Sequence, residues 1–428
     1  MPIQGLGKKG HPQLAGESVH VPKKVGAPHA PAIDAVEKGA PKAISKHDAK
    51  LLKALGPAPL LKKLRGLSDA AVRGSIASTE NLQPMPSGEA IAAVLKPLQI
   101  GQVAEIPLNM IHPGQVQISF TNVRQKMEDF VERLDERREA YEAHPKSSKA
   151  VLLDSAEALT AVIGPDGHSL ILTDGHHHVA ALKAVQAMVH KILGPASLHP
   201  QKPGKNASEL EFISQLFGGA QGSPSIPIRI VGDLRDLPEK ELWKTLASGV
   251  DGHKMAYLID ADGKTHASAG AKFSKLQNNP YRYLASVITG KIELTKEQGK
   301  LGFTLRGGDP PVWLKVLGHT ADFIEFSIAR ALVSAYKKVG KTYDPKKPLT
   351  DTDRLICRWA LMHAKLDPDN PEHEMLKDLI VTTKDRSQKK LEKRLEIEDG
   401  QLHIPRKIYQ PSKRRLKRLD EAFQKLVH

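Results

Sequence analysis

The chain changes from a strand pattern to a helix pattern within two residues, and this junction constrains the fold more than any other feature. Leu170–Thr173 is a run of apolar and β-branched residues, as in a buried strand. Residues 177–192 repeat apolar side chains at helical spacing, and Asp174 and Gly175 lie close before them. A strand that leads directly into a helix needs a sheet beside it and a core beneath it. The chain must therefore pack strands and helices together.

The other periodic segments predict an α+β fold, with a small mixed β-sheet and packed helices followed by an all-α C-terminal extension. Strands are expected at residues 103–108, 161–163, 169–173 and 226–231, with a turn at 164–167 that makes a hairpin of the middle two. A second short hairpin is expected around residues 260–263. Helices are expected at residues 87–95 (with Ser87 as N-cap), 121–143, 177–192, 237–248, 311–339 and 351–381, and two basic helices after residue 384.

The excess of positive charge lies at the two ends of the chain. Residues 1–66 hold 12 Lys or Arg against 4 Asp or Glu, and residues 384–428 hold 14 against 7, which together account for the formal net charge of +15. Such ends attract nucleic acid, anionic membranes or acidic proteins, or serve only as solvated tails. The predicted organisation is a disordered basic segment over residues 1–66, a helical lead-in over 67–100, a folded domain over 101–335 and a basic helical extension over 336–428.

The first of these segments, residues 1–66, has two parts with different sequence patterns. Residues 1–43 have no apolar period, which predicts disorder, whereas residues 44–67 predict short amphipathic helices broken at Gly56.

Several classes of protein are excluded by composition. Cys357 is the single cysteine, so an internal disulfide framework and a cysteine zinc cluster are excluded, and a reducing compartment is favoured. No apolar run is long enough for a membrane-spanning helix, and the first residues lack the apolar stretch of a signal peptide. We expect a cytoplasmic protein, with delivery by a specialised secretion machine as the alternative. Aromatic residues make up only 4 %, which argues against a surface of stacked rings.

The junction at Asp174 and Gly175 has the chemistry of a phosphate site. The first N–H groups of a helix lack internal partners and the helix dipole adds positive potential there. Gly175 would let a ligand approach the backbone, and the imidazoles of His176, His177 and His178 can donate hydrogen bonds to an anion. Asp174 would either cap the helix, which is the plain alternative, or bind a metal ion that accompanies the phosphate. A zinc site of the three histidines is disfavoured because adjacent helix positions point about 100° apart.

The Asp174–His177 signature resembles that of the ParB-like proteins of the ParB/sulfiredoxin superfamily, specifically the putative ParB-like nuclease branch. The resemblance covers roughly residues 100–335. The further matching segments, in the expected order, are Ile111–Gln115 followed by Val123 and Lys126, Leu242–Trp243, Tyr257–Gly263, Asn279–Ala285 and Phe323–Phe326.

This resemblance implies a phosphate corner at the start of the helix after the signature, and a nucleotide or nucleic acid as partner. It implies catalytic roles for Asp174, His176 and His177, with Asp174 also as the expected Mg²⁺ ligand. The phosphate-binding residues that it implies are Gln115, Arg124, Lys126, Gly175, His178 and Arg282. The family pattern usually has arginine at the position of His178, and histidine lacks the permanent charge and the fork of that side chain. Phosphate affinity is therefore expected to be weaker or pH-dependent, unless Arg124, Lys126 or Arg282 substitutes.

Three functions remain open, because one fold hosts varied chemistry. The first is nuclease or NTPase-type phosphate chemistry, the second is phosphate transfer to a small molecule or a protein side chain, and the third is a non-enzymatic DNA-binding or adaptor role. Plain structural roles also remain open for single residues: a salt bridge at a helix start for Arg282, a solvated side chain for Lys126, a loop-fixing amide for Gln115 and a core position for Trp243.

The last helix combines a basic face with an apolar stripe. Its apolar residues, at helical spacing, are Leu416, Leu419, Phe423 and Leu426, and the basic residues beside them are Arg414, Arg415, Lys417 and Arg418. We expect the stripe to dock on the protein and the four basic side chains to bind nucleic acid.

Overall fold

The computed structural model describes residues 50, 53–143, 153, 157–193, 216, 224–249, 254–288, 323–363, 396–398, 401–403 and 413–428. These residues all belong to one compact unit, Lys42–His428. The predicted disorder of residues 1–43 lies outside the described residues. None of the described helices is both long and apolar enough to cross a membrane.

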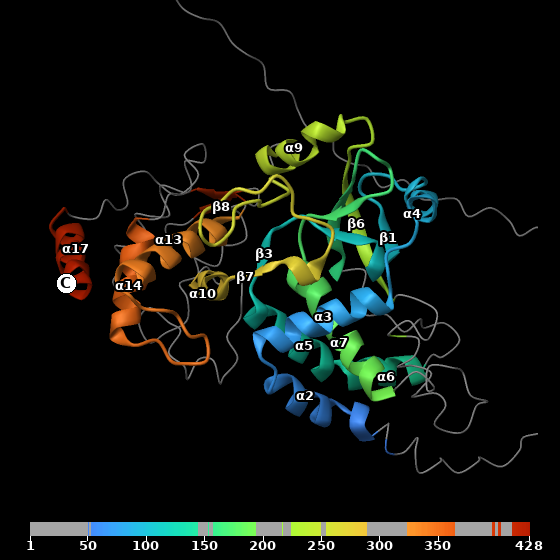
Figure 1. Ribbon diagram of the computed structural model, residues 1–428, viewed down its shortest axis with the longest axis horizontal. Helices are drawn as coiled ribbons and strands as arrows, with labels where there is room; N and C mark the ends of the chain where they lie inside the picture. The colour runs from blue at the N-terminus through green and yellow to red at the C-terminus, as the bar shows by residue number, and fades with distance from the viewer. Residues whose placement is uncertain are drawn as a thin grey trace, which may run out of the picture. The chain divides into compact units, whose positions relative to one another are not determined.

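The largest sheet among the described residues is mixed and has five strands, of which β1 and β6 are labelled in Figure 1. The strands are β1 (Val103–Pro107), β2 (Ile111–Pro113), β4 (Leu159–Ile163), β5 (Leu170–Leu172) and β6 (Ser225–Asp233), in the order β1-β6-β4-β5-β2. β4 and β5 are the two strands of the predicted hairpin and pair antiparallel, whereas β5 and β2 pair parallel. The predicted α+β class with a small mixed sheet is confirmed.

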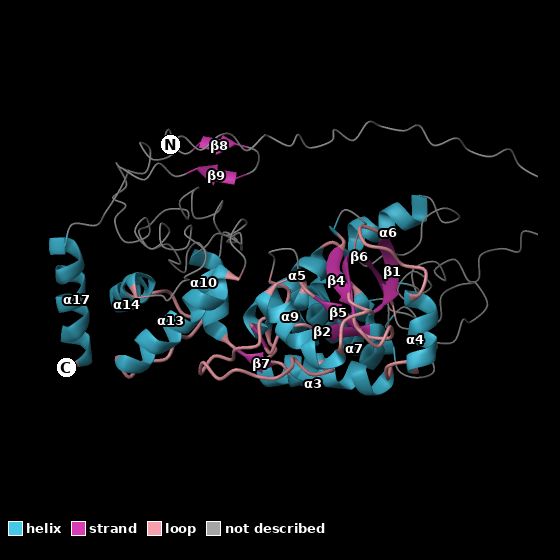
Figure 2. Ribbon diagram, turned by 90° about the horizontal axis from the view of Figure 1, so that it is seen from above, coloured by secondary structure: helices cyan, strands magenta, loops and turns pink. Residues whose placement is uncertain are grey.

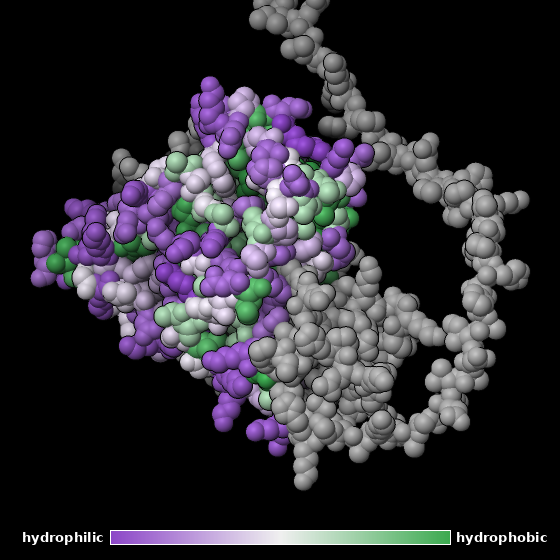
Figure 3. Space-filling view, turned by 45° about the vertical axis from the view of Figure 1, so that its right-hand side comes forward, coloured by the Kyte–Doolittle hydropathy of each residue, from purple (hydrophilic) through white to green (hydrophobic). Residues whose placement is uncertain are grey.

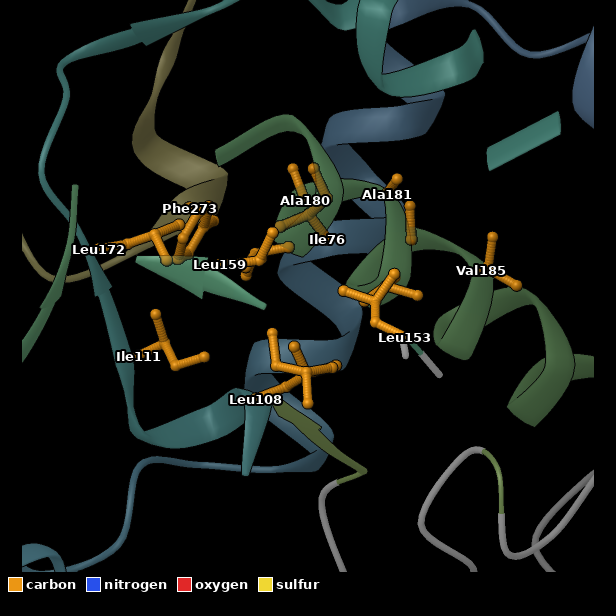
Figure 4. Packing of buried hydrophobic residues seen from close by; sticks show 14 of the residues in the cluster. Ile76, Leu108, Ile111, Leu153, Leu159, Leu172, Ala180, Ala181, Val185 and Phe273 are labelled. Carbon is orange, nitrogen blue, oxygen red and sulfur yellow. The ribbon is translucent and has the colours of Figure 1, made fainter. Parts of the chain in front are cut away.

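The two faces of the sheet are covered by different helices. On one face, α7 (His176–Leu193) packs with α3 (Asp69–Leu82) and α5 (Phe120–Glu132) over the main core, where Leu172 meets Phe273 (Figure 4). On the other face, α9 (Leu242–Ser248) covers Val162 and Ile171. Because side chains alternate along a strand, the hairpin strands supply apolar residues to both cores.

Residues before β1 belong to the folded part of the protein. Helix α2 (Pro57–Arg65) is a helix of the kind expected at residues 44–67, and it begins directly after Gly56. It lies within the 1–66 segment assigned overall as basic and disordered, but its Leu60 and Leu64 are buried in the main core. Helix α4 (Gly88–Leu95) begins as predicted, with the Ser87 side chain accepting a hydrogen bond from the Ala90 amide at 3.3 Å.

The long helix expected at residues 121–143 is instead two helices, α5 and α6 (Leu134–Ala143), separated at Arg133. The break turns Leu134 into the core while Arg133 and Arg137 both reach Glu157, at 2.9 and 3.7 Å. A helical period alone does not show such a break, because the partner Glu157 is distant in sequence.

The helices after the sheet have a core of their own. Helices α10 (Pro280–Ile288), α13 (Ile324–Lys338) and α14 (Asp351–Met362) pack around Tyr336 and the buried thiol of Cys357. Seen from above, α10, α13 and α14 follow one another beside the sheet region (Figure 2). The remaining parts of the helices expected at 311–339 and 351–381 lie outside the described residues.

The prediction of a basic helix directly after residue 384 is wrong for two short segments, which are strands. Residues Glu396–Glu398 (β8) and Gln401–His403 (β9) form an antiparallel hairpin. The intervening Asp-Gly pair is a strong hairpin signal, which the many charged neighbours obscured.

The final helix, α17 (Lys413–Val427), docks on α14 as predicted. Phe423 is buried and stacks on the Trp359 ring at 3.9 Å, and the Trp359 indole donates a hydrogen bond to Asp420 at 2.8 Å. Hydrophilic side chains cover much of the described surface on the face shown in Figure 3, with hydrophobic ones in small separate groups. Arg414, Lys417 and Arg418 are exposed.

Candidate functional site

The junction between β5 and α7 is fixed by hydrogen bonds to β4 and by glycine. After β5, the Thr173 hydroxyl bonds that of Thr160 at 2.7 Å. Gly175 has a φ of +89°, which other residues rarely adopt, and a Cβ there would lie 2.7 Å from the Leu159 side chain. The Gly175 carbonyl accepts the first bond of α7, from Val179 at 3.1 Å. The sequence therefore requires glycine at this site for backbone geometry.

Two of the three histidines at the start of α7 hold a neighbouring loop. The Nε2 atom of His176 accepts a hydrogen bond from the Gly114 amide at 2.8 Å, and that of His177 accepts one from the Ser119 amide at 3.1 Å. An imidazole nitrogen that accepts must be unprotonated, so both rings are neutral with the proton on Nδ1. His176 is 1 % exposed. This arrangement favours positioning over proton transfer for these two residues.

The surroundings keep all three imidazoles neutral near pH 7. Burial, with the charge of Arg282, lowers the pKa of His176 to about 3, opposed by the Leu172 carbonyl. The same two causes lower the pKa of His177. Burial and nearby Lys126 lower the pKa of His178 to about 4, against the opposing charge of Asp174. The positive potential of the site therefore comes from other groups.

The first turn of α7 presents its backbone amides without acceptors. The backbone N–H groups of His176, His177 and His178 donate no hydrogen bond to any residue in the described part of the chain. Asp174 does not cap them, because its Oδ1 accepts from the adjacent Gly175 amide at 2.7 Å, and its side chain is exposed. An 18-residue helix thus begins with free donors and its full dipole beside an exposed carboxylate.

Gln115 and Arg282 lie together behind this turn, in the interior. Gln115 is 4 % exposed and Arg282 is 3 % exposed. The Nη1 atom of Arg282 donates to Gln115 Oε1 at 3.0 Å and to the Gln117 carbonyl at 2.7 Å. Burial lowers the pKa of Arg282 to about 10, against the opposing charge of Glu325. Both residues therefore shape the loop rather than face solvent.

The remaining two expected phosphate ligands differ in environment. Arg124 is buried and forms an ion pair with Asp69 on α3, and it also donates to the Thr121 hydroxyl at 3.3 Å. Lys126 is partly exposed, pairs with Asp129 at 3.6 Å, and its charge acts on both His177 and His178. Of the three cations expected to replace the family arginine, Lys126 is the one that combines proximity to the histidines with access to solvent.

Sequence reasoning missed Gly114 and Ser119, the residues whose amides bond the histidines. A Cβ on Gly114 would lie 2.3 Å from the Leu172 carbonyl oxygen, so the loop and β5 approach too closely for any other residue. The Pro-Gly pair beside the recognised Gln115 was the available signal. The described residues contain no group of three His, Cys, Asp or Glu side chains that could hold a metal ion.

Residues 104–303 match the family described as putative ParB-like nuclease. The resemblance to ParB-like proteins is confirmed over this segment. The crystal structure of protein Atu1540 from Agrobacterium tumefaciens is 17 % identical, covering 55 % of this chain and 91 % of its own, with a TM-score of 0.27, which is too low to support a shared arrangement. No curated protein matches the chain. The ParB-like segment includes the whole of the junction at Asp174 and all six expected phosphate-binding residues.

Proposed function

We propose that the ParB-like segment binds a phosphate group of a nucleotide or nucleic acid at the start of α7, and that its chemistry is hydrolysis of a phosphate ester. The observation that carries this proposal is the free amides of His176, His177 and His178 beside the exposed carboxylate of Asp174. Backbone donors at a helix start suit phosphate oxygens, and they act without a neighbouring arginine.

Each residue has a separate role in this proposal. His176 and His177 hold the loop that backs the phosphate site, and Lys126 supplies the cation. His178 makes no hydrogen bond to the described residues, and its ring stays neutral at pH 7 because burial lowers its pKa to about 4, so it adds no charge to the site.

Mg²⁺ is the ion that we propose for this site, held through Asp174 and the ligand's own phosphates. The Asp174 carboxylate is exposed, and Mg²⁺ is commonly held by one or two carboxylates together with substrate phosphates. When bound, the ion would neutralise charge on the phosphate that is attacked. The carboxylate would hold the ion at the mouth of the site while the amides of α7 orient the phosphate.

Calorimetric titration with pyrophosphate and with ATP, each with and without Mg²⁺, tests the proposal. Lys126→Gln should weaken binding about three- to tenfold, because a partly exposed charge–charge contact is lost. The matched control is Lys191→Gln, an exposed lysine farther along the same helix as the histidines, which should leave affinity unchanged.

Two further variants separate binding from turnover. Asp174→Ala should abolish Mg²⁺-dependent turnover while binding without Mg²⁺ persists. His178→Arg should preserve or strengthen phosphate affinity, since a permanent cation replaces a neutral ring. Equal affinity in the wild type, Lys126→Gln and His178→Arg would contradict the site.

A second function, nucleic-acid binding by α17, is favoured by one specific observation. The helix buries Phe423 and ties Asp420 to Trp359, so its position is set by docking rather than by solvation alone. That docking leaves Arg414, Lys417 and Arg418 exposed. We infer that these cations, together with Arg415, contact nucleic-acid phosphates, as an addition to the hydrolase or as a non-enzymatic adaptor.

A further inference from the structure

We propose that Arg282 is a positioning residue that locks the 114–119 loop, whose central residues Gln117–Ile118 form the short strand β3 beside β7 (Gln277–Asn278), against the start of α7 and links that loop to helix α13. The functional part of this inference, an effect on phosphate affinity, rests on the proposed function. The structural part stands on contacts alone.

The first set of contacts joins Arg282 to the loop. Its Nη1 atom donates both to the Gln117 carbonyl, at 2.7 Å, and to the Gln115 side chain, at 3.0 Å. One nitrogen therefore fixes a backbone group and a side chain two residues apart. Since Arg282 is 3 % exposed, the guanidinium holds these two groups together inside the protein and does not contact a ligand.

The second set of contacts joins Arg282 to α13. The guanidinium carbon lies 3.6 Å from the centre of the Phe326 ring, and Nη2 lies 3.8 Å from the Glu325 carboxylate. Both partners are buried in the first turn of α13. A cation held over an aromatic face and beside a carboxylate is restrained in position and orientation.

The third set of contacts connects the loop to the candidate site. Gln117 is fully buried, donates to the Ile259 carbonyl at 2.7 Å and accepts from Asn279 at 2.6 Å. On either side of it, the amides of Gly114 and Ser119 donate to His176 and His177. A displacement of α13 would reach these histidines through Arg282 and the loop.

The energetic cost of a buried arginine supports a positioning role. Removing a guanidinium from water is costly, and replacement of a buried charge and its partners by apolar side chains is often neutral or stabilising. The Nε–H of Arg282 has no hydrogen-bond partner among the described residues, which adds to that cost. Arginine suits this place because its guanidinium has several donors: Nη1 bonds Gln115 and Gln117, while Nη2 lies beside Glu325.

Hydrogen exchange of the loop amides is the test, with no ligand present. In Arg282→Met, the Gly114 and Ser119 amides should exchange at least about tenfold faster relative to core amides of α7. Arg282→Lys should restore part of the protection, because an ammonium can still donate to the Gln117 carbonyl. Phe326→Leu removes the aromatic ring on which the Arg282 guanidinium lies, and it should also accelerate exchange of the Gly114 and Ser119 amides. This variant still tests the inference if Arg282→Met does not fold.

A matched destabilised control separates positioning from general loss of stability. Leu64→Ala removes a fully buried side chain of α2 and should lower the melting temperature without selective exchange at Gly114 and Ser119. Pyrophosphate affinity should fall about tenfold in Arg282→Met and recover in part in Arg282→Lys. Unchanged relative protection in Arg282→Met, or in both Arg282→Lys and Phe326→Leu, would overturn the inference. Absence of pyrophosphate and ATP binding in the wild type would instead refute the proposed function, and the exchange result would still decide the role of Arg282.

Discussion

The Nε2 atom of His176 accepts a hydrogen bond from the backbone amide of Gly114 at 2.8 Å, across 62 residues of sequence. This bond brings the end of β2 to the first turn of α7, beside the parallel pair of β2 and β5. A histidine that the signature marks for chemistry therefore also has a structural task. Its partner must be glycine, because the Leu172 carbonyl lies where a Cβ would be.

Gly114→Ala should destabilise the protein by about 2–4 kcal/mol, because the added methyl group would meet the Leu172 carbonyl oxygen at 2.3 Å. Urea unfolding followed by circular dichroism measures this change. Gly74→Ala is the matched control, since this glycine lies inside α3 with nothing within 4 Å of the added Cβ, and it should stabilise by about 0.5–1 kcal/mol. A Gly114→Ala variant as stable as the wild type would show that the loop can move away from β5.

The stability of the protein should fall on the acid side of pH 6.5, in part through His178. The pKa of His178 is about 4 in the folded protein and near 6.5 when unfolded, so the unfolded chain takes up the proton first as pH falls. The contribution is complete above pH 6.5 and is lost progressively towards pH 4. His178→Gln should remove about 1–2 kcal/mol of the pH-dependent loss between pH 6.5 and 4.5, as measured by urea unfolding at each pH. Identical slopes for wild type and variant would contradict the shifted pKa.

Lys183 is a buried cation on α7 that should cost stability at neutral pH. It is 4 % exposed, its ammonium lies 5.7 Å from the Phe273 ring, and the carboxylate whose charge acts on it is that of Glu80. Burial lowers its pKa to about 8 in the folded protein, against 10.5 in the unfolded chain. The unfolded chain therefore binds more protons between these values, and wild-type stability should rise with pH from about 8 to 10.5.

Replacing Lys183 by methionine should remove that pH dependence. Lys183→Met should raise the free energy of unfolding at pH 7 by about 2 kcal/mol, and the difference from wild type should shrink as pH rises towards 10.5. Lys191→Met, at an exposed position of α7, should change neither quantity. A destabilised Lys183→Met variant would show that the ammonium is stabilised by Glu80, the carboxylate whose charge opposes the lowered pKa.

The fold was predictable where its signals are local. The β4–β5 hairpin, the Ser87 cap and the abrupt start of α7 depend on neighbouring residues, and the structure has all three. The docking stripe of α17 was predictable for the same reason, because helical spacing alone places Leu419 and Phe423 on one face.

The candidate site was only partly predictable, because burial and long-range pairing do not show in a sequence. The motif that contains Arg282 was recognised, but its interior position depends on Phe326 and Gln115, which are 44 and 167 residues away. The same holds for the break at Arg133, which depends on Glu157. Residue types predicted the chemistry of the junction, whereas tertiary contacts decide which side chains remain free to perform it.

The basic face of α17 provides the last prediction. Its exposed cations lie opposite the buried Phe423, so they can be replaced without disturbing the contact with Trp359. Any binding of nucleic acid there should be driven largely by counterion release, with little dependence on sequence. Replacing Arg414, Arg415, Lys417 and Arg418 by Gln should weaken binding by a similar factor for every DNA or RNA sequence, and should flatten the dependence of affinity on salt.

Fluorescence anisotropy over a salt series, with several unrelated oligonucleotides, measures both effects. The control is Lys337→Gln with Lys346→Gln, two exposed lysines outside α17, which should leave the salt slope unchanged. Mononucleotide turnover should barely change in the fourfold variant, because the phosphate site at α7 does not include α17. If the fourfold variant binds DNA and RNA at low salt as tightly as the wild type does, the helix is a solvated appendage, and nucleic-acid contact must be sought elsewhere on the protein.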